Sequence, residues 1–103
     1  MIGIKRQPTH PGKILREDFL IPMGLSQTEL ADMLKTTFRT VNEILNEKRG
    51  VSPEMAVRLA RFFGTSEELW LNLQDQYDLY KVKAKKEAEL GEIIPYKQLF
   101  KTA

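Results

Sequence analysis

The 103-residue sequence predicts an all-α fold of five helices, with a long fifth helix and a C-terminal extension. Apolar residues recur three or four positions apart along most of the chain, which is the period of a helix with one buried face. A residue that starts helices precedes such a run, as Ser52 does, and a glycine that ends helices follows, as Gly64 does. With 42% hydrophobic residues, the chain can build one modest core.

The first helix is expected to follow a short arm. Residues 1–9 show no helical pattern, so we expect a flexible N-terminal arm. Pro11 is tolerated at the first position of a helix, and Pro22 and Gly24 are expected to end this one. His10 is the only histidine, and we expect it to cap the helix or to be exposed. A lone histidine without a cluster of other ligands does not predict a metal site.

Residues 25–50 contain the second and third helices. Ser26 is expected to cap the second helix, and Thr37 the third. Only two residues separate Leu34 from Thr37, which is about the length of the turn in a helix-turn-helix pair. Lys35 lies in this turn, and if its backbone is left-handed it costs roughly 1 kcal/mol relative to glycine.

The third helix is expected to have two chemically different faces. With residues placed every ~100° around the helix, Val41, Ile44 and Leu45 fall on one apolar side. The other side is polar, but it is not the usual pattern of long Lys and Glu pairs. Its side chains can form hydrogen bonds with base edges in a major groove, although periodicity alone also allows an ordinary solvated face. These residues are Arg39, Asn42, Glu43 and Asn46.

The last two helices have clear start signals. Ser52 followed by Pro53 starts the fourth helix, which Gly64 ends. Thr65 with Glu68 three residues later predicts a capping box at the start of the fifth helix.

The fifth helix is apolar on two sides, and one side is expected to bury in the domain. The other side needs a partner, and a second copy of the chain is the simplest one. A two-fold dimer places two recognition helices about one DNA turn, roughly 34 Å, apart. The residues expected at this dimer interface are Leu71, Leu79 and Val82.

The domain is expected to span residues 10–80, followed by an extension over residues 81–103. The extension ends in residues that are more apolar than those of a solvated tail. We expect them to pack back on the domain; adding a strand to a partner or covering another protein are the alternatives. The apolar residues are Ile93, Ile94, Tyr96, Leu99 and Phe100.

The same residues carry a family resemblance. The segment from Gln27 to Gly50 resembles the helix-turn-helix of phage-repressor-like proteins. The runs PTHPGKILREDFLIPMGLSQTELA and TVNEILNEKRGVSPEMAVRLARFFGTSEELWLNLQDQYDL are similar to the HigA family of antitoxins, also called VapI-like, so the resemblance covers roughly residues 8–80. It implies a phage-repressor-like domain that forms a homodimer, binds its own double-stranded operator, and neutralises a HigB/RelE-like ribonuclease toxin. The alternative is a stand-alone transcription regulator without a toxin.

The expected DNA contacts follow from side-chain chemistry. Arg39 can donate two hydrogen bonds to guanine O6 and N7, worth about 1 to 3 kcal/mol of discrimination. Glu43 either accepts from a cytosine amino group or holds Arg39 in place, and the second role is favoured. Phe38 either meets a thymine methyl group or closes the core. We expect base contacts from Thr37, Phe38, Arg39, Thr40, Asn42 and Glu43, and phosphate contacts from Gln27, Asn46, Lys48 and Arg49.

Composition limits the other functions. The net charge is only +2, so nucleic-acid binding has to come from the local placement of charges. The absence of cysteine excludes disulfides and thiolate chemistry. No apolar run reaches the ~18 residues of a membrane span, which favours a soluble, cytoplasmic protein. Without a nucleophile–base pair, a metal cluster or a glycine-rich phosphate loop, we expect no cofactor and no enzyme activity.

Overall fold

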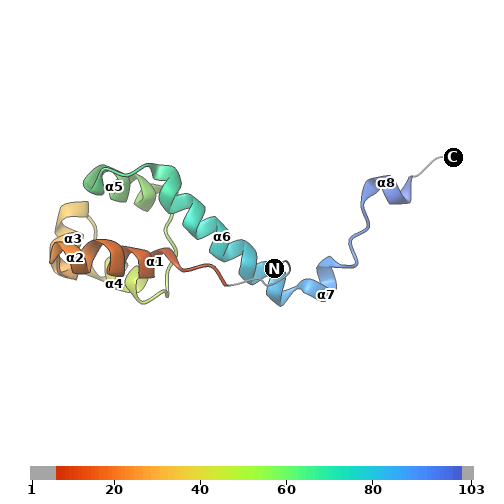
Figure 1. The fold of residues 1–103 in the computed structure, drawn as a ribbon, viewed down its shortest axis with the longest axis horizontal. Helices are drawn as coiled ribbons and strands as arrows, with labels where there is room; N and C mark the ends of the chain where they lie inside the picture. The colour runs from red at the N-terminus through yellow and green to blue at the C-terminus, as the bar shows by residue number, and fades with distance from the viewer. Residues whose placement is uncertain (1–6, 101–103) are drawn as a thin grey trace.

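The computed structural model describes residues 7–100, and most of the expected N-terminal arm, residues 1–6, lies outside them together with residues 101–103. The described chain contains helices and no strand, which confirms the all-α prediction. Figure 1 shows a helical domain from which the long helix α6 (Glu67–Lys85) leads away to two short helices, α7 (Glu87–Leu90) and α8 (Tyr96–Leu99).

The first helical segment is continuous but changes its hydrogen-bonding pattern midway. It consists of α1 (Pro11–Ile14), the π-helix η1 (Leu15–Leu20) and α2 (Ile21–Met23), and it ends at Gly24 with a φ of 67°. The expected start and end are therefore correct, whereas the π-helical stretch was not predicted. Pro22 lies two residues after the end of this stretch. A proline lacks an N–H group and crowds the carbonyl four residues earlier, and the wider π turn accommodates both effects.

The helix-turn-helix forms as the sequence predicts. Ser26 caps α3 (Gln27–Leu34) with a full capping box, and Thr37 caps α4 (Phe38–Leu45) by accepting a backbone hydrogen bond. Lys35 ends α3 in the left-handed conformation, with a φ of 59°. The turn therefore carries the strain expected of a non-glycine residue at this position.

Helix α5 (Pro53–Phe63) and helix α6 (Glu67–Lys85) follow, and the start of α6 corrects one prediction. The residue that caps α6 is Ser66 rather than Thr65. The Thr65 hydroxyl instead accepts a hydrogen bond from the indole Nε1 of Trp70, over 2.8 Å. The local pattern that predicted a capping role for Thr65 could not reveal that its hydroxyl bonds to Trp70.

One hydrophobic core holds the five helical segments together. Trp70 of α6 is fully buried and packs close to Phe19, with 5.2 Å between the ring centroids. Phe63 of α5 contacts the same aromatic group, so α1–α2, α5 and α6 meet there. The other large, fully buried side chains come from the first helical segment and from α3, α4 and α5: Leu15, Leu30, Val41, Ile44, Leu45 and Leu59.

Glycine at position 12 allows α1 to approach the end of α4. Gly12 is buried, and a Cβ atom built there would overlap the carbonyl oxygen of Ile44. A second close approach involves Gly50, where a Cβ atom would lie 2.8 Å from Nε2 of Gln74. Both glycines therefore allow segments distant in sequence to come into direct contact.

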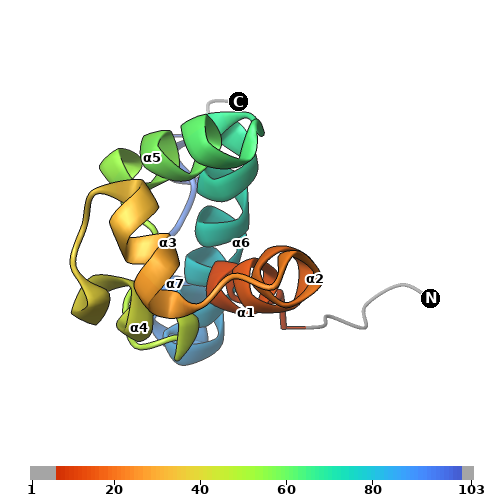
Figure 2. The ribbon, with the colours of Figure 1, turned by 90° about the vertical axis from the view of Figure 1, so that its left-hand side faces the viewer.

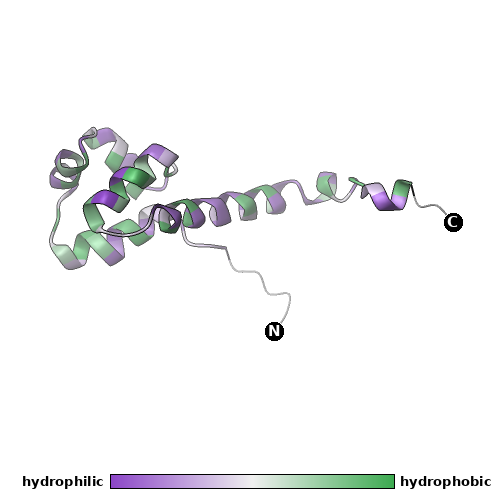
Figure 3. Cartoon of the chain, turned by 90° about the horizontal axis from the view of Figure 1, so that it is seen from above, coloured by the Kyte–Doolittle hydropathy of each residue, from purple (hydrophilic) through white to green (hydrophobic). Residues whose placement is uncertain are grey.

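The C-terminal arm, residues 86–100, does not pack back on the domain. It contains α7 (Glu87–Leu90) and α8 (Tyr96–Leu99), and all its residues are exposed. Figure 3 shows that the arm carries apolar residues although it points away from the domain. Our first expectation for the extension is thus wrong. Helices of four residues without capping side chains are too short to present a broad apolar face to the core.

Candidate nucleic-acid interface

Helix α4 separates a buried face from a polar face. Val41, Ile44 and Leu45 are each only 1% exposed and belong to the core. In Figure 2, α3 and α4 lie at the front of the domain while α6 extends behind them. The opposite face of α4 is accordingly directed outward. The three buried side chains hold the helix against the core.

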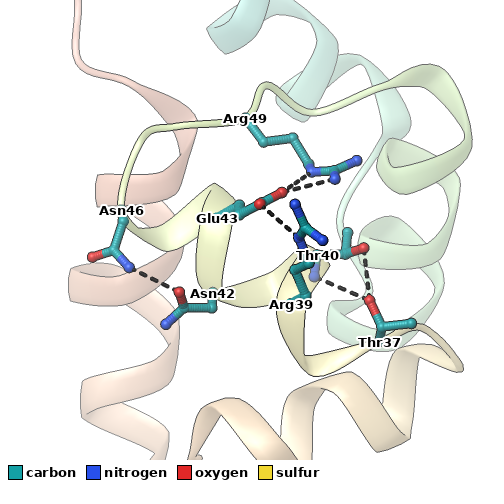
Figure 4. A network of polar contacts seen from close by, with 7 residues as sticks. All are labelled: Thr37, Arg39, Thr40, Asn42, Glu43, Asn46 and Arg49. Carbon is teal, nitrogen blue, oxygen red and sulfur yellow. Dashed lines mark hydrogen bonds and ion pairs between the residues drawn. The ribbon is translucent and has the colours of Figure 1, made fainter.

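Two arginines meet at one carboxylate on this outward face (Figure 4). Arg39 donates from Nε to Glu43 Oε2 over 3.0 Å, which is the i, i+4 pairing that the sequence favoured. Arg49, in the loop after α4, donates to Glu43 Oε1 from Nε over 2.8 Å and from Nη2 over 2.7 Å. We call these three residues the arginine bridge. Hydrogen bonds from Arg39 and then Arg49 hold the pKa of the Glu43 carboxyl below its ordinary value.

A row of three amides joins α3 to α4 beside the arginine bridge. Asn42 Nδ2 donates to Gln27 Oε1 over 2.9 Å, and Asn46 Nδ2 donates to Asn42 Oδ1 over 3.2 Å. Gln27 opens α3, Asn42 lies on α4, and Asn46 is the residue at which α4 ends. Residues that the sequence divided between base and phosphate contacts therefore form one hydrogen-bonded row.

The N-terminal turn of α4 presents two hydroxyls and an aromatic ring. Thr37 Oγ1 accepts from the Thr40 backbone N–H over 3.1 Å and donates to Thr40 Oγ1 over 2.9 Å. Phe38 is 51% exposed. The alternative in which Phe38 closes the core is therefore wrong, and its ring is available to a partner.

Two arginines that sequence reasoning missed hold the ends of the helix-turn-helix. Arg16 Nη1 donates to the carbonyl of Leu45 over 2.8 Å, at the end of α4. Arg58 Nη1 donates to the carbonyl of Leu34 over 2.8 Å, at the end of α3. A cation at a helix C-terminus satisfies carbonyls that have no partner within the helix. The two contacts span 29 and 24 residues, so no local pattern could predict them.

The loop that carries Arg49 is fastened by a buried glutamine. Gln74 of α6 accepts a hydrogen bond from the Val51 backbone N–H over 2.8 Å and donates to Asp78 over 2.9 Å. Lys48 lies in the same loop and is exposed. Fixing the loop to α6 limits the positions that Arg49 and Lys48 can take. Gln74 would have been found only by noticing a polar residue on the buried side of the fifth helix.

The expected dimer strip on α6 is only partly present. Leu79 and Val82 are 55% and 48% exposed. The expectation for Leu71 is corrected, because this residue is partly buried and packs against the core of its own domain. The exposed strip is therefore shorter than predicted and lies in the part of α6 that extends beyond the core.

Other kinds of site are not indicated in the described part of the chain. Residues 7–100 contain no group of three or more histidine, cysteine or acidic side chains that could hold a metal ion. His10 is buried and caps α1 by accepting the Gly12 N–H at Nδ1, over 2.8 Å, so the capping expectation is correct and the exposed alternative is wrong. Within the same residues, no helix is both long and apolar enough to cross a bilayer.

Known proteins are similar to this chain in sequence and in fold. The chain matches the Helix-turn-helix family over residues 15–70. It is 45% identical over 86 residues to virulence-associated protein I of Dichelobacter nodosus, covering 84% of this chain and 79% of that protein. It is 32% identical over 91 residues to antitoxin HigA-1 of Vibrio cholerae, covering 88% and 86%. The solved structure of Pseudomonas aeruginosa antitoxin HigA with the higBA promoter is 44% identical, with a TM-score of 0.83, and the match covers 86% of this chain and 98% of that one.

The similarity in sequence and the similarity in structure agree. The family match includes α3 and α4, whose short turn and capping residues indicated a helix-turn-helix. The relatives align over most of their own length as well as over most of this chain. The chain therefore belongs to the helix-turn-helix family that includes the HigA antitoxins and virulence-associated protein I.

Proposed function

We propose that this chain is a dimeric, sequence-specific DNA-binding antitoxin that represses its own operon, with residues 10–80 as the DNA-binding domain. The observation that carries the proposal is the outward polar face of α4, set on a helix whose other face is buried. A helix of this kind can enter the major groove and present donors and acceptors to base edges. The solved HigA relative in complex with its promoter supports the same role.

The first turns of α4 would contact the bases. Among the residues that the structure describes, Arg39 donates only from its Nε–H, so its two terminal nitrogens can face the O6 and N7 atoms of a guanine. Phe38 exposes a ring that can meet a thymine methyl group. Three neighbouring polar residues complete the proposed base-contacting set: Thr37, Thr40 and Asn42.

The ends of the helix-turn-helix would contact the phosphate backbone. Gln27 lies at the start of α3, where backbone N–H groups also point outward. Asn46, Lys48 and Arg49 follow the end of α4 and are exposed. Contacts of this kind fix the position of the protein on the duplex and make its affinity depend on salt, but they do not select a sequence.

A homodimer would give two copies of α4 the spacing of successive major grooves. Leu79 and Val82 expose apolar surface on α6 that a second copy can cover. A two-fold dimer would read a palindromic operator, with half-sites about one DNA turn apart. The palindrome is thus a consequence of the proposed symmetry.

The antitoxin part of the proposal rests on the family. The Vibrio cholerae relative is named as an antitoxin, and we propose a HigB/RelE-like ribonuclease as the toxin partner of this chain. The second candidate is a stand-alone regulator, which the exposed face of α4 supports equally well. An adjacent upstream reading frame of about a hundred residues, basic and RelE-like, favours the first candidate. Its absence favours the second.

The deciding experiment is fluorescence anisotropy with the duplex directly upstream of the chain's own operon, against a scrambled duplex, at two salt concentrations. We expect a preference above about tenfold that survives at the higher salt, because base contacts resist salt better than phosphate contacts. Arg39→Ala is expected to relax discrimination at one base position. Lys48→Ala is expected to weaken all duplexes alike and to lower the salt slope by about 1.

Equal binding to both duplexes, lost at the higher salt, would contradict sequence-specific recognition of this DNA by α4. The same sequence-independent loss in both variants would contradict the division between base and phosphate contacts. Arg39 and Lys48 are both exposed, so neither substitution touches the core. A loss of DNA binding in either variant therefore does not reflect unfolding.

A further inference from the structure

We infer that Glu43 is a positioning residue that determines specificity by coupling Arg39 to Arg49, rather than a residue that contacts a base. The inference rests on the proposed DNA-binding function and goes further, since it links the base contact to the backbone contact through one carboxylate. From the sequence, Glu43 is expected among the base-contacting residues, although a role in holding Arg39 is favoured, and Arg49 is expected only as a phosphate contact. The arginine bridge agrees with the favoured role of Glu43 and adds Arg49 to it.

The first step concerns the carboxylate itself. Both oxygens of Glu43 already accept hydrogen bonds, Oε2 from Arg39 and Oε1 from Arg49. The Glu43 side chain is 26% exposed, whereas those of Arg39 and Arg49 are 82% and 48% exposed. The carboxylate thus lies beneath the two guanidinium groups. To accept from a cytosine amino group it would have to turn away from partners that hold it in charge-assisted hydrogen bonds.

The second step concerns the donors that remain. A guanidinium group has five N–H donors in a fixed planar fork. Arg39 donates its Nε–H to Glu43, which leaves the edge formed by its two terminal nitrogens facing outward. This is the edge that matches guanine O6 and N7. Arg49 donates to Glu43 from Nε and Nη2 and keeps Nη1 for a phosphate oxygen. Glu43 therefore orients one arginine toward bases and the other toward the backbone.

The third step concerns charge. Without the carboxylate, two neighbouring cations would stand at the DNA surface, and each could pair with the nearest phosphate of any sequence. With it, the three side chains carry a net charge of about +1 and a defined geometry. Glu43 should therefore weaken non-specific binding while it favours the guanine contact. A purely structural residue would change both kinds of binding together.

The test compares Glu43→Gln with wild type on the operator and scrambled duplexes used above. The glutamine amide keeps the shape of the side chain, but an NH2 group replaces one of the two carboxylate oxygens, so in this geometry one of the two arginines loses its acceptor. Asp32→Asn is the matched control, because it removes one negative charge from α3. The Asp32 side chain is exposed and forms no hydrogen bond or ion pair with the residues that the structure describes.

We expect Glu43→Gln to bind the scrambled duplex more tightly than wild type and to lower the ratio of operator to scrambled affinity about tenfold. Asp32→Asn is expected to leave this ratio within about twofold of wild type. In wild type, the effects of Arg39→Ala and Arg49→Ala on operator affinity should be non-additive, and in the Glu43→Gln background they should add. A ratio for Glu43→Gln that matches Asp32→Asn, or additive effects in wild type, would overturn the inference.

A measurement without DNA separates this inference from the proposed function. In the free protein, the pKa of the Glu43 carboxyl, followed by NMR, should rise when either Arg39 or Arg49 is replaced by alanine. If the wild type shows no preference for its operator but both substitutions raise this pKa, the arginine bridge exists and the proposed function fails. If the wild type prefers its operator and neither substitution moves the pKa, the proposed function stands and the inference fails.

Discussion

The helical domain and the C-terminal arm both contain large apolar residues, yet only the domain buries them. Trp70 in the domain is 0% exposed, whereas Tyr96 and Phe100 in the arm are 74% and 62% exposed. The two aromatic rings of the arm contact one another, with 4.7 Å between their centroids, but the arm has no buried residue. Apolar content alone therefore does not make a core in this chain.

The two regions differ in the helices that carry the apolar residues. Helices α3, α4, α5 and α6 each begin at a serine or threonine whose side chain caps the helix, and they run for 8 to 19 residues. Helices α7 and α8 have four residues each and no capping side chain. A helix needs a few turns to present a continuous apolar stripe, and a cap offsets part of the cost of its unpaired N–H groups. Pairs of substitutions in the two regions test this difference directly.

The largest contrast is expected from the aromatic residues. Trp70→Ala removes a fully buried ring and should lower the free energy of unfolding by about 3 to 5 kcal/mol, because the cavity collapses only partly. Phe100→Ala should change it by no more than about 0.5 kcal/mol, since that ring is exposed. Chemical denaturation of both variants measures the difference. The dependence of the free energy of unfolding on denaturant concentration should be compared as well. A similar loss in both would mean that the arm contributes to the core.

A smaller contrast is expected from two glycines. Gly12→Ala places a methyl group against the Ile44 carbonyl, and separating α1 from α4 should cost about 1 to 3 kcal/mol of unfolding free energy. Gly91→Ala in the arm has its nearest neighbour at 3.4 Å, so it should be neutral within about 0.5 kcal/mol. Thermal unfolding followed by circular dichroism is sufficient for both. An unaffected Gly12→Ala variant would contradict the close packing of these two helices.

The sequence predicted what is encoded locally. The turn from Leu34 to Thr37 and the two faces of α4 follow from spacing within a few residues, and all of them are present. The contacts that sequence reasoning missed join residues far apart in the chain, such as Arg16 with Leu45. Periodicity places a residue on a face of its own helix, but it does not identify the residue on the other helix that will meet it.

The candidate site shows the same division. The pair of Arg39 with Glu43 lies within one helix turn and was foreseen, whereas the contribution of Arg49 depends on how the loop after α4 folds back. That loop contains Glu47 in the left-handed conformation, with a φ of 61°, which nothing in the local sequence indicated. The C-terminal arm was mispredicted because its composition suggested burial while its short helices do not support it.

The smallest effect that distinguishes the domain from the arm is a pH dependence at His10, where the domain begins. Burial holds the pKa of His10 below its ordinary value of 6.5, although the nearby Glu47 and Asp78 act in the opposite direction. The unfolded chain therefore binds a proton at a higher pH than the folded chain does. The contribution of neutral His10 to the free energy of unfolding should be fully present above pH 6.5. It should fall as the pH drops below this value, until His10 is protonated in the folded protein as well. Protonation at Nδ1 would also remove the acceptor for the Gly12 N–H.

His10→Asn is the matched variant, because asparagine can accept the same capping hydrogen bond and does not titrate. It loses the edge contact between His10 and Tyr77, so its stability is expected to be lower at every pH. The informative quantity is the slope of the free energy of unfolding against pH. Between about pH 7.5 and pH 5, the free energy of unfolding of wild type should fall more steeply than that of the variant. Equal slopes would mean that His10 titrates alike in the folded and unfolded chains, and that its burial at the start of α1 does not favour the neutral ring.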